Sequence, residues 1–324
     1  MNRRTLLAAL PAATLLPHAA GAQGAAWPTG PIRAVVPFAP GSATDTVGRL
    51  FAEKMRENLG QPVVVENRAG ASGLIGAEAV ARAAPDGNTV LVGTNSTNAA
   101  ARALFRNVPF DMENGFVAIS TIATVPLLVA VRADSPHRTL AELIAAARAR
   151  PEGITYATAS ASQQVAAASL AAQANVQMLA VPYRSSPLAV QDLLAGRVDL
   201  FVADQAVILP QAQAGALRIL AVTSAQRSAA VPDIPTVREA GGLPDYEVIA
   251  WFCLFAPAGT PADRVARLNQ AVVHAARSEE VRSRLASGLG MTVGSSTPEE
   301  AAAFVRAETV KWTNAVRQAG IEPQ

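Results

Sequence analysis

The sequence predicts an α/β protein of two lobes, each a mainly parallel sheet with flanking helices, joined by a hinge of crossing strands. The chain has 324 residues, of which 50% are hydrophobic and 16% charged, so it can bury a sizeable core, and its length suggests about two domains. From Trp27 onward, short β-branched segments alternate with longer alanine-rich amphipathic segments. This alternation is typical of parallel strands connected by crossover helices.

The N-terminal segment has the features of a secretion signal. Arg3 and Arg4 precede a small-residue apolar run at 6–16, and small side chains up to Ala22 suit a signal peptidase. Prolines interrupt the run before it reaches the roughly 20 residues that a membrane span needs. We therefore predict that residues 1–22 are a signal peptide and that the mature protein is periplasmic, with the general secretory and twin-arginine routes both open.

The first lobe begins with three strand and loop units, over residues 27–125. Each predicted strand is followed by a loop rich in Gly, Ser, Thr and Asn. The predicted strands are 32–36, 63–66 and 89–92, and the predicted helices are 44–59 and 73–83. Because ligands bind at the carboxyl ends of strands in open α/β sheets, the three loops should share one rim.

A second set of units follows over residues 126–248. It starts with a strand at 127–131 and a helix whose Thr139 and Glu142 match a capping box. The further predicted strands are 154–157, 178–181, 200–202 and 217–222, and the further predicted helices are 163–174 and 187–195.

The chain is then expected to return to the first lobe over 249–324. A strand is predicted at 251–256, and C-terminal helices follow, one of them at 261–278. The segments 126–132 and 249–257 separate the middle part of the chain from both flanks. They are therefore the hinge candidates.

Several function classes are disfavoured by composition. A formal net charge of +2 gives no field for recruiting nucleic acid, and one cysteine with three histidines leaves little for a disulfide framework or a metal site. Cys253 lies in an apolar strand and is expected to be a packing residue. His137 and His274 are expected on the surface, and no nucleophile-elbow or zinc-protease motif occurs. The sequence thus predicts no enzyme, no metal and no cofactor.

The loop from Phe38 to Asp45 offers the first binding chemistry. It places small residues, two hydroxyls and a helix start directly after a strand, and a helix N-terminus presents unpaired N–H groups that favour an anion such as a carboxylate. The alternative interpretation is that Ser42 or Thr44 only caps the helix. Segments 67–73 and 93–97 repeat the arrangement, which favours a shared carboxylate site.

Several spaced motifs resemble the Bug receptors, the extracytoplasmic solute receptors of tripartite tricarboxylate transporters. The resemblance covers essentially the whole mature chain. The motifs run from Trp27-Pro28 to Asn67-Arg68, then over 83–87, Val181-Pro182-Tyr183, 220–224 with Arg227, 232–237 and 256–261.

The resemblance implies a two-lobed periplasmic binding protein that closes on a small organic acid: a di- or tricarboxylate, an aromatic carboxylate or an amino acid. It also implies membrane permease subunits as partners, and the receptor is expected to be a monomer. In the family, the loops corresponding to Pro40 through Asp45 and Ala69 through Gly73 hold a carboxylate. A receptor that reports to a membrane signalling partner would have the same fold and is the alternative function.

The second lobe departs from the family pattern. The loop at 156–164 lacks the usual glycines, Gln164 stands where a His is common, and Arg184 replaces a usual Lys. The acidic residue that follows Val198-Asp199 stands one position later than in the family pattern, at Asp204. A shift of one residue in a strand reverses the direction of the side chain. The residues expected to bind the ligand are Pro40, Gly41, Ser42, Ala43, Thr44, Asp45, Ala71, Ser72, Thr94, Asn95, Ser160, Ser162, Arg184 and Asp204.

Overall fold

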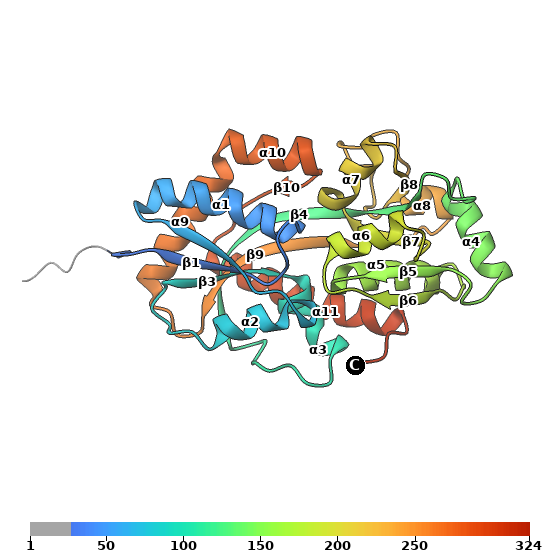
Figure 1. Ribbon diagram of the computed structural model, residues 1–324. Helices are drawn as coiled ribbons and strands as arrows, with labels where there is room; N and C mark the ends of the chain where they lie inside the picture. The colour runs from blue at the N-terminus through green and yellow to red at the C-terminus, as the bar shows by residue number, and fades with distance from the viewer. Residues whose placement is uncertain (1–26) are drawn as a thin grey trace, which may run out of the picture.

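The computed structural model describes residues 27–324 and contains two sheets that share one long strand (Figure 1). In the first sheet, β1 (Ile32–Val36) pairs in parallel with β2 (Val63–Asn67) and β3 (Thr89–Thr94). Strand β9 (Ile249–Pro257) runs antiparallel beside β3. The short β10 (Thr292–Val293) adds an antiparallel pair to β4. We call this sheet with its helices the first lobe.

The second sheet repeats the parallel arrangement. Strand β5 (Thr155–Thr158) lies between β6 (Leu179–Pro182) and β7 (Leu200–Asp204) and is parallel to both. Strand β8 (Leu217–Val222) joins this sheet through β4. We call this sheet with its helices the second lobe.

One strand of 17 residues, β4 (Phe116–Arg132), belongs to both sheets. Its residues 116–126 pair antiparallel with β9, and its residues 127–132 pair antiparallel with β7 and β8. Thr223 ties the crossing together, because its Oγ1 accepts a hydrogen bond from the Leu127 amide at 2.7 Å and donates one to the Val248 carbonyl at 2.6 Å.

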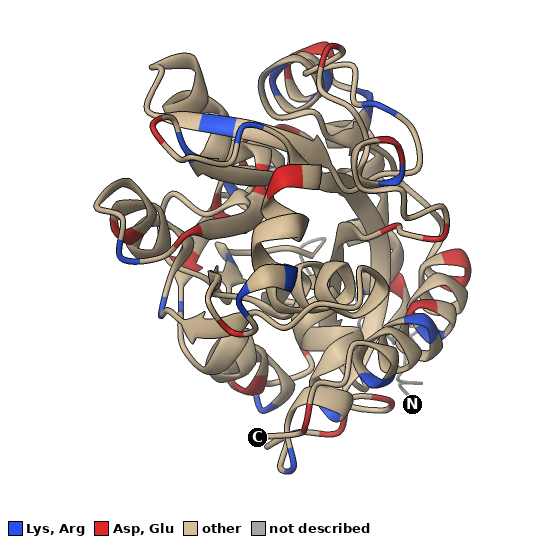
Figure 2. Ribbon diagram, turned by 90° about the vertical axis from the view of Figure 1, so that its right-hand side faces the viewer, with Lys and Arg blue, Asp and Glu red and all other residues tan. Residues whose placement is uncertain are grey.

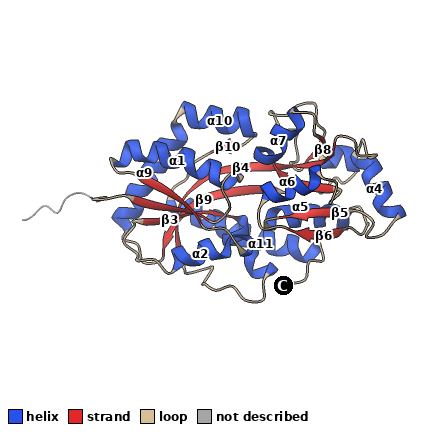
Figure 3. Cartoon of the chain, in the orientation of Figure 1, coloured by secondary structure: helices blue, strands red, loops and turns tan. Residues whose placement is uncertain are grey.

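Helices flank both sheets (Figure 3). In the first lobe they are α1 (Ala43–Leu59), α2 (Leu74–Ala81), α3 (Ala101–Leu104), α9 (Ala262–Arg277) and α10 (Glu279–Leu289), with the short turns η1 (Ala71–Gly73) and η2 (Ser96–Ala100). In the second lobe they are α4 (Leu140–Ala149), α5 (Ala161–Gln173), α6 (Ser186–Leu194), α7 (Gln205–Gln213) and α8 (Val237–Gly241). Helix α11 (Pro298–Gln318) contacts β4, η2 and α5.

Helix α1 lies close against the first sheet, and Gly48 allows it. A β-carbon at this position would come within 2.9 Å of Val36 and 3.4 Å of Val92. The chain therefore brings the start of α1 directly over the carboxyl ends of β1 and β3, which is the position that a strand-to-helix binding loop needs.

The structure confirms most of the predicted elements. The parallel units β1 to β3 and β5 to β7 lie within about two residues of their predicted bounds, and the Thr139 capping box is formed. Strand β4 is much longer than the predicted 127–131, because it begins at Phe116 and continues through Pro126. Strands β4, β8, β9 and β10 add antiparallel pairs to the predicted parallel ones.

Two further features bear on function. The predicted signal peptide, 1–22, lies outside the described residues. Among residues 27–324, no helix is both long and apolar enough to cross a membrane. Figure 2 shows Lys and Arg positions interspersed with Asp and Glu positions along the ribbon, in keeping with the nearly balanced formal charge.

Candidate functional site

Four helix starts from both lobes meet at a small cavity between the two sheets. The start of α1 comes from the first lobe, and the starts of α5, α6 and α7 come from the second. The cavity has a volume of about 30 Å³, which is room for one or two waters. Its lining consists of Phe38, Ser42, Ala43, Thr44, Thr94, Asn95, Ser96, Ser160, Ser162, Gln163, Ser186, Asp204, Ala250 and Phe252.

The start of α1 presents free amides to this cavity. Ser42 is the N-cap, and its Oγ accepts a hydrogen bond from the Asp45 amide at 3.2 Å. Within residues 27–324, the amides of Ala43 and Thr44 have no acceptor, and both residues line the cavity. Ser42 therefore caps the helix, as the alternative interpretation expects, and two N–H groups at the helix start remain without an acceptor among the described residues.

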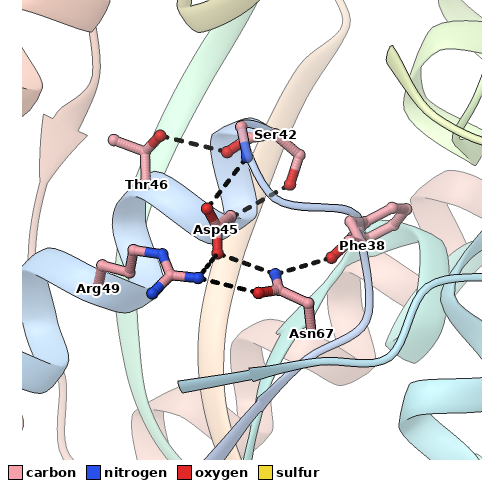
Figure 4. Close-up of polar contacts among 7 residues, drawn as sticks. Phe38, Ser42, Asp45, Thr46, Arg49 and Asn67 are labelled. Carbon is pink, nitrogen blue, oxygen red and sulfur yellow. Dashed lines mark hydrogen bonds and ion pairs between the residues drawn. The ribbon is translucent and has the colours of Figure 1, made fainter. Parts of the chain in front are cut away.

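Asp45 does not line the cavity, and its carboxylate points toward Arg49 and Asn67, where it holds the loop in shape (Figure 4). Its carboxylate accepts hydrogen bonds from the Gly41 amide at 3.1 Å and from Asn67 Nδ2 at 2.8 Å, and it pairs with Arg49 at 3.0 Å. Asn67 Nδ2 also donates to the Phe38 carbonyl at 3.0 Å, so β2 fixes both ends of the loop. Burial opposes ionisation of Asp45, but the bonds from Arg49, Asn67 and Gly41 outweigh it and lower the pKa.

The end of β3 contributes an unpaired amide group. The Thr94 hydroxyl accepts a hydrogen bond from the Ser96 amide at 3.2 Å, and the Thr94 amide donates to Thr97 Oγ1 at 3.1 Å. Asn95 is only 1% exposed, and its Nδ2 has no hydrogen-bond partner. Because a buried donor without a partner costs about 1–3 kcal/mol, Asn95 calls for an acceptor in the cavity that it lines.

Within the described part of the chain, a single hydrogen bond joins the lobes directly at the site. The amide of Ala161, the first residue of α5, donates to Ser96 Oγ at 3.1 Å. The hydroxyl of Ser160, the N-cap of α5, lies 3.0 Å from that of Ser162. The Ser96 oxygen thus accepts from one of the amides at the start of α5.

Gln163 links two segments of the second lobe and is almost completely buried. Its Oε1 accepts a hydrogen bond from the Ala159 amide, and its Nε2 donates to Ser186 Oγ, both at 2.8 Å. With both ends engaged, the Gln163 side chain fixes the start of α6 beside the start of α5.

Asp204 is the single charged side chain in the lining of the cavity, as far as residues 27–324 define it. Burial raises the pKa of its carboxyl to about 6, and only the Gln163 amide and the backbone at Asp204 act against this rise. Phe38, Ala250 and Phe252 form the apolar part of the wall. The cavity therefore combines free amide donors, hydroxyls and one weakly acidic carboxyl, without an arginine or lysine.

The structure brings eight of the predicted residues together. Those that line the cavity are Ser42, Ala43, Thr44, Thr94, Asn95, Ser160, Ser162 and Asp204. The other six, which do not line it, are Pro40, Gly41, Asp45, Ala71, Ser72 and Arg184. Ala71 and Ser72 belong to a stretch of four residues with positive φ, 70–73, and Ala71 is exposed.

Six lining residues were not predicted. They are Phe38, Ser96, Gln163, Ser186, Ala250 and Phe252. Phe38 and Ser96 stand in the loops that the sequence already indicated, and Gln163 and Ser186 stand at predicted helix starts. Ala250 and Phe252 alternate along β9, so the crossing strand gives one face to the cavity, a signal that the period of two could have shown.

A larger hollow, of about 440 Å³, lies beside α11. Phe116, Phe255 and Val305 are among its lining residues, all of which come from the first lobe. The smaller cavity is lined from both lobes and is therefore the candidate site.

Comparison with known proteins gives the class. The sequence model of one protein family, described as tripartite tricarboxylate transporter family receptor, matches residues 47–321. A protein from the tcbD-tcbE intergenic region of Pseudomonas sp. strain P51 is 40% identical, covering 96% of this chain and 93% of its own length. BugT of Bordetella pertussis is 34% identical, covering 91% and 90%. The chain belongs to this family of solute-binding receptors, and it is not an enzyme.

Solved structures agree with this assignment. The periplasmic binding protein BugD is 33% identical, with a TM-score of 0.87, over 92% of this chain and 100% of that one. R. palustris Rpa4515, solved with adipate, is 35% identical, with a TM-score of 0.88, over 92% and 100%. MatC of Rhodopseudomonas palustris, solved with malate, is 35% identical, with a TM-score of 0.83, over 90% and 100%. The chain has the two-lobed periplasmic binding protein fold.

Proposed function

We propose that this protein is an exported receptor that captures a small organic carboxylate between its lobes and delivers it to the membrane permease subunits of a tripartite tricarboxylate transporter. The observation that carries the proposal is the set of donors at the cavity. The amides of Ala43 and Thr44 and the Asn95 side chain have no acceptor among residues 27–324, and all three residues line the same cavity.

The proposal includes how the chain is divided. Residues 1–22 are removed near Ala22, residues 27–125 and 249–324 form the first lobe, and residues 126–248 form the second. The receptor works as a monomer that diffuses in the periplasm. Adipate and malate in two related structures support carboxylates as the ligand class.

Binding energy comes from a few charge-assisted hydrogen bonds. Each contributes about 1.5–3 kcal/mol. Three or four such bonds together reach the roughly 8 kcal/mol of a micromolar complex, because burial of the ligand's apolar surface offsets the cost of association. No basic side chain is needed, because helix starts carry partial positive charge on their free N–H groups.

The mechanism is capture by closure. A cavity of about 30 Å³ does not admit a dicarboxylate, so the lobes separate to let the ligand in. The ligand's carboxylate accepts from the first-lobe donors, and the second lobe then closes over it by bending at β4 and β9. In the closed state with ligand, a ligand oxygen takes the place of Ser96 Oγ at the Ala161 amide. The permease recognises the surface that closure creates.

The substitution Ala43→Pro tests the amide donors directly. Proline is tolerated at the first helical position, and Ser42, with ψ 161°, already has the conformation that a residue before proline prefers. The variant deletes one N–H and leaves the helix intact. We expect affinity for the bound carboxylate to fall at least about tenfold, because one charge-assisted bond is lost.

The matched control is Ala262→Pro, at the exposed first position of α9. The readout is calorimetric titration with a carboxylate found by thermal-shift screening, starting with malate and adipate. The melting temperature without ligand reports whether each variant is folded. Equal affinity of Ala43→Pro and wild type would contradict the proposal. Deletion of the permease genes tests the transport role, because uptake of the ligand should then be lost.

A further inference from the structure

We propose that Asp204 selects the ligand, favouring an acid that carries an ammonium or hydroxyl donor beside its carboxylate over a plain dicarboxylate. This inference rests on the proposed function and names the ligand class of the same cavity. The carboxylate would be held by the first lobe, and the donor would face Asp204 in the second.

The position of Asp204 carries the first part of the argument. It is the last residue of β7 and the N-cap of α7, yet its side chain makes no capping hydrogen bond. It lines the cavity that the free amides of Ala43 and Thr44 also line. A carboxyl that neither caps its helix nor forms an ion pair is available to a ligand.

As far as residues 27–324 show, the surroundings of Asp204 carry no compensating charge. Helices α5 and α7 contain no charged residue. Asp192 of α6 pairs with Arg197 at 2.6 Å, and Arg132 at the far end of β4 pairs with Asp134 at 2.9 Å. From α1, Asp45 is engaged by Arg49 and faces the loop.

The charged groups on the remaining neighbouring elements are bound elsewhere. Arg218 of β8 donates to the carbonyls of Ala133 and Ser135, Tyr156 of β5 is uncharged, and Glu280 of α10 pairs with Lys54. An ionised Asp204 therefore meets the ligand without a basic side chain to offset it.

Two ligand types then have opposite pH dependence. A ligand carboxylate can face Asp204 only if Asp204 is protonated, and a plain dicarboxylate has no donor group to place there instead, so its affinity falls as the pH rises above about 6. A ligand ammonium favours the ionised carboxyl, so its affinity rises through the same pH and then levels off. The limiting slope is about tenfold per pH unit for one proton.

Pairs of acids that differ in one group make the test. L-Glutamate is compared with glutarate, and L-aspartate and L-malate with succinate, by thermal shift and calorimetric titration from pH 5 to 8. For wild type at pH 8, we expect the amino or hydroxy acid of a pair to bind at least tenfold tighter than the plain dicarboxylate. The plain dicarboxylate should weaken between pH 6 and 8.

Asp204→Asn should remove at least tenfold of this preference and make dicarboxylate affinity independent of pH. Asp245→Asn, an exposed acid in the second lobe, is the control and should change neither. If Asp204→Asn does not fold, the opposite slopes of the two ligand types in wild type still decide the matter. Plain dicarboxylates that bind tighter at pH 8, or an unchanged preference in Asp204→Asn, would overturn the inference alone. Binding of no carboxylate to either protein would overturn the proposed function as well.

Discussion

The carboxylate of Asp45 is predicted to stabilise the loop that carries the first-lobe donors. Asp45→Asn keeps the shape of the side chain but removes its charge. Asp45 is 5% exposed and accepts from the Gly41 amide and Asn67 Nδ2 while it pairs with Arg49. In the variant, the new amide group donates toward groups that are themselves donors.

The cost follows from these contacts. One buried donor loses its acceptor, at about 1–3 kcal/mol, and a charge-assisted bond becomes a neutral one, at about 1 kcal/mol. The free energy of unfolding should therefore fall by about 2–4 kcal/mol. For a chain of this size, each kcal/mol lowers the melting temperature by about 2 °C, so a drop of about 4–8 °C is expected.

The loss should depend on pH with a defined sign. The pKa of Asp45 is lowered in the folded protein, so its stabilisation is complete above its ordinary value of 3.8 and disappears as the pH falls through the folded pKa. The difference between wild type and Asp45→Asn should hence be constant from pH 5 to 8 and shrink below pH 3.8.

Thermal and urea unfolding, followed by circular dichroism, measure both effects. Asp263→Asn is the control, because Asp263 is also an acid in the first turn of a helix but is exposed. It should cost less than about 1 kcal/mol. A melting temperature for Asp45→Asn within 1 °C of wild type, or an equal loss in Asp263→Asn, would refute this role of Asp45.

Two other predictions concern the crossing strands. Thr223→Val keeps the volume but leaves the buried Leu127 amide and Val248 carbonyl without a partner, so it should lower the free energy of unfolding by about 2–4 kcal/mol in urea titrations. Thr292→Val, at an exposed position, is the control and should have little effect. Equal losses in the two variants would contradict the role of Thr223 at the crossing. Cys253 is fully buried, and burial raises the pKa of its thiol, so iodoacetamide at pH 8 should modify it only after unfolding in urea. Mass spectrometry measures the modification. Labelling of the native protein at the rate of the unfolded protein would contradict the burial of Cys253 in β9.

Local patterns predicted the parallel units and much of the site. The strands before Pro37 and before Gly93 are short β-branched runs, and each is followed by small and polar residues, so the sequence alone places Ser42, Thr44 and Asn95 on one rim. The helix starts at Ser42, Ser160 and Ser185 need only local chemistry, and the structure has all three as N-caps.

Contacts between distant segments could not be predicted in this way. The bond from the Ala161 amide to Ser96 joins residues 65 positions apart, and it decides that the two lobes meet at these residues. The direction of Asp204 depended on the register of β7 against β4, which places Asp204 opposite Leu127. Asp45 shows a third limit, because an acid in a first turn can face a ligand or its own loop, and only Asn67 from the next strand decides between them.

The central claim is that backbone N–H groups at the start of α1 hold the ligand's carboxylate, and amide NMR tests it most directly. In a titration of ¹⁵N-labelled protein with a carboxylate that binds, the account predicts large downfield proton shifts at Ala43 and Thr44, with smaller changes at Ala262 and Asp263. If the amide signals of Ala43 and Thr44 stay unchanged while those of residues elsewhere shift, the claim is contradicted.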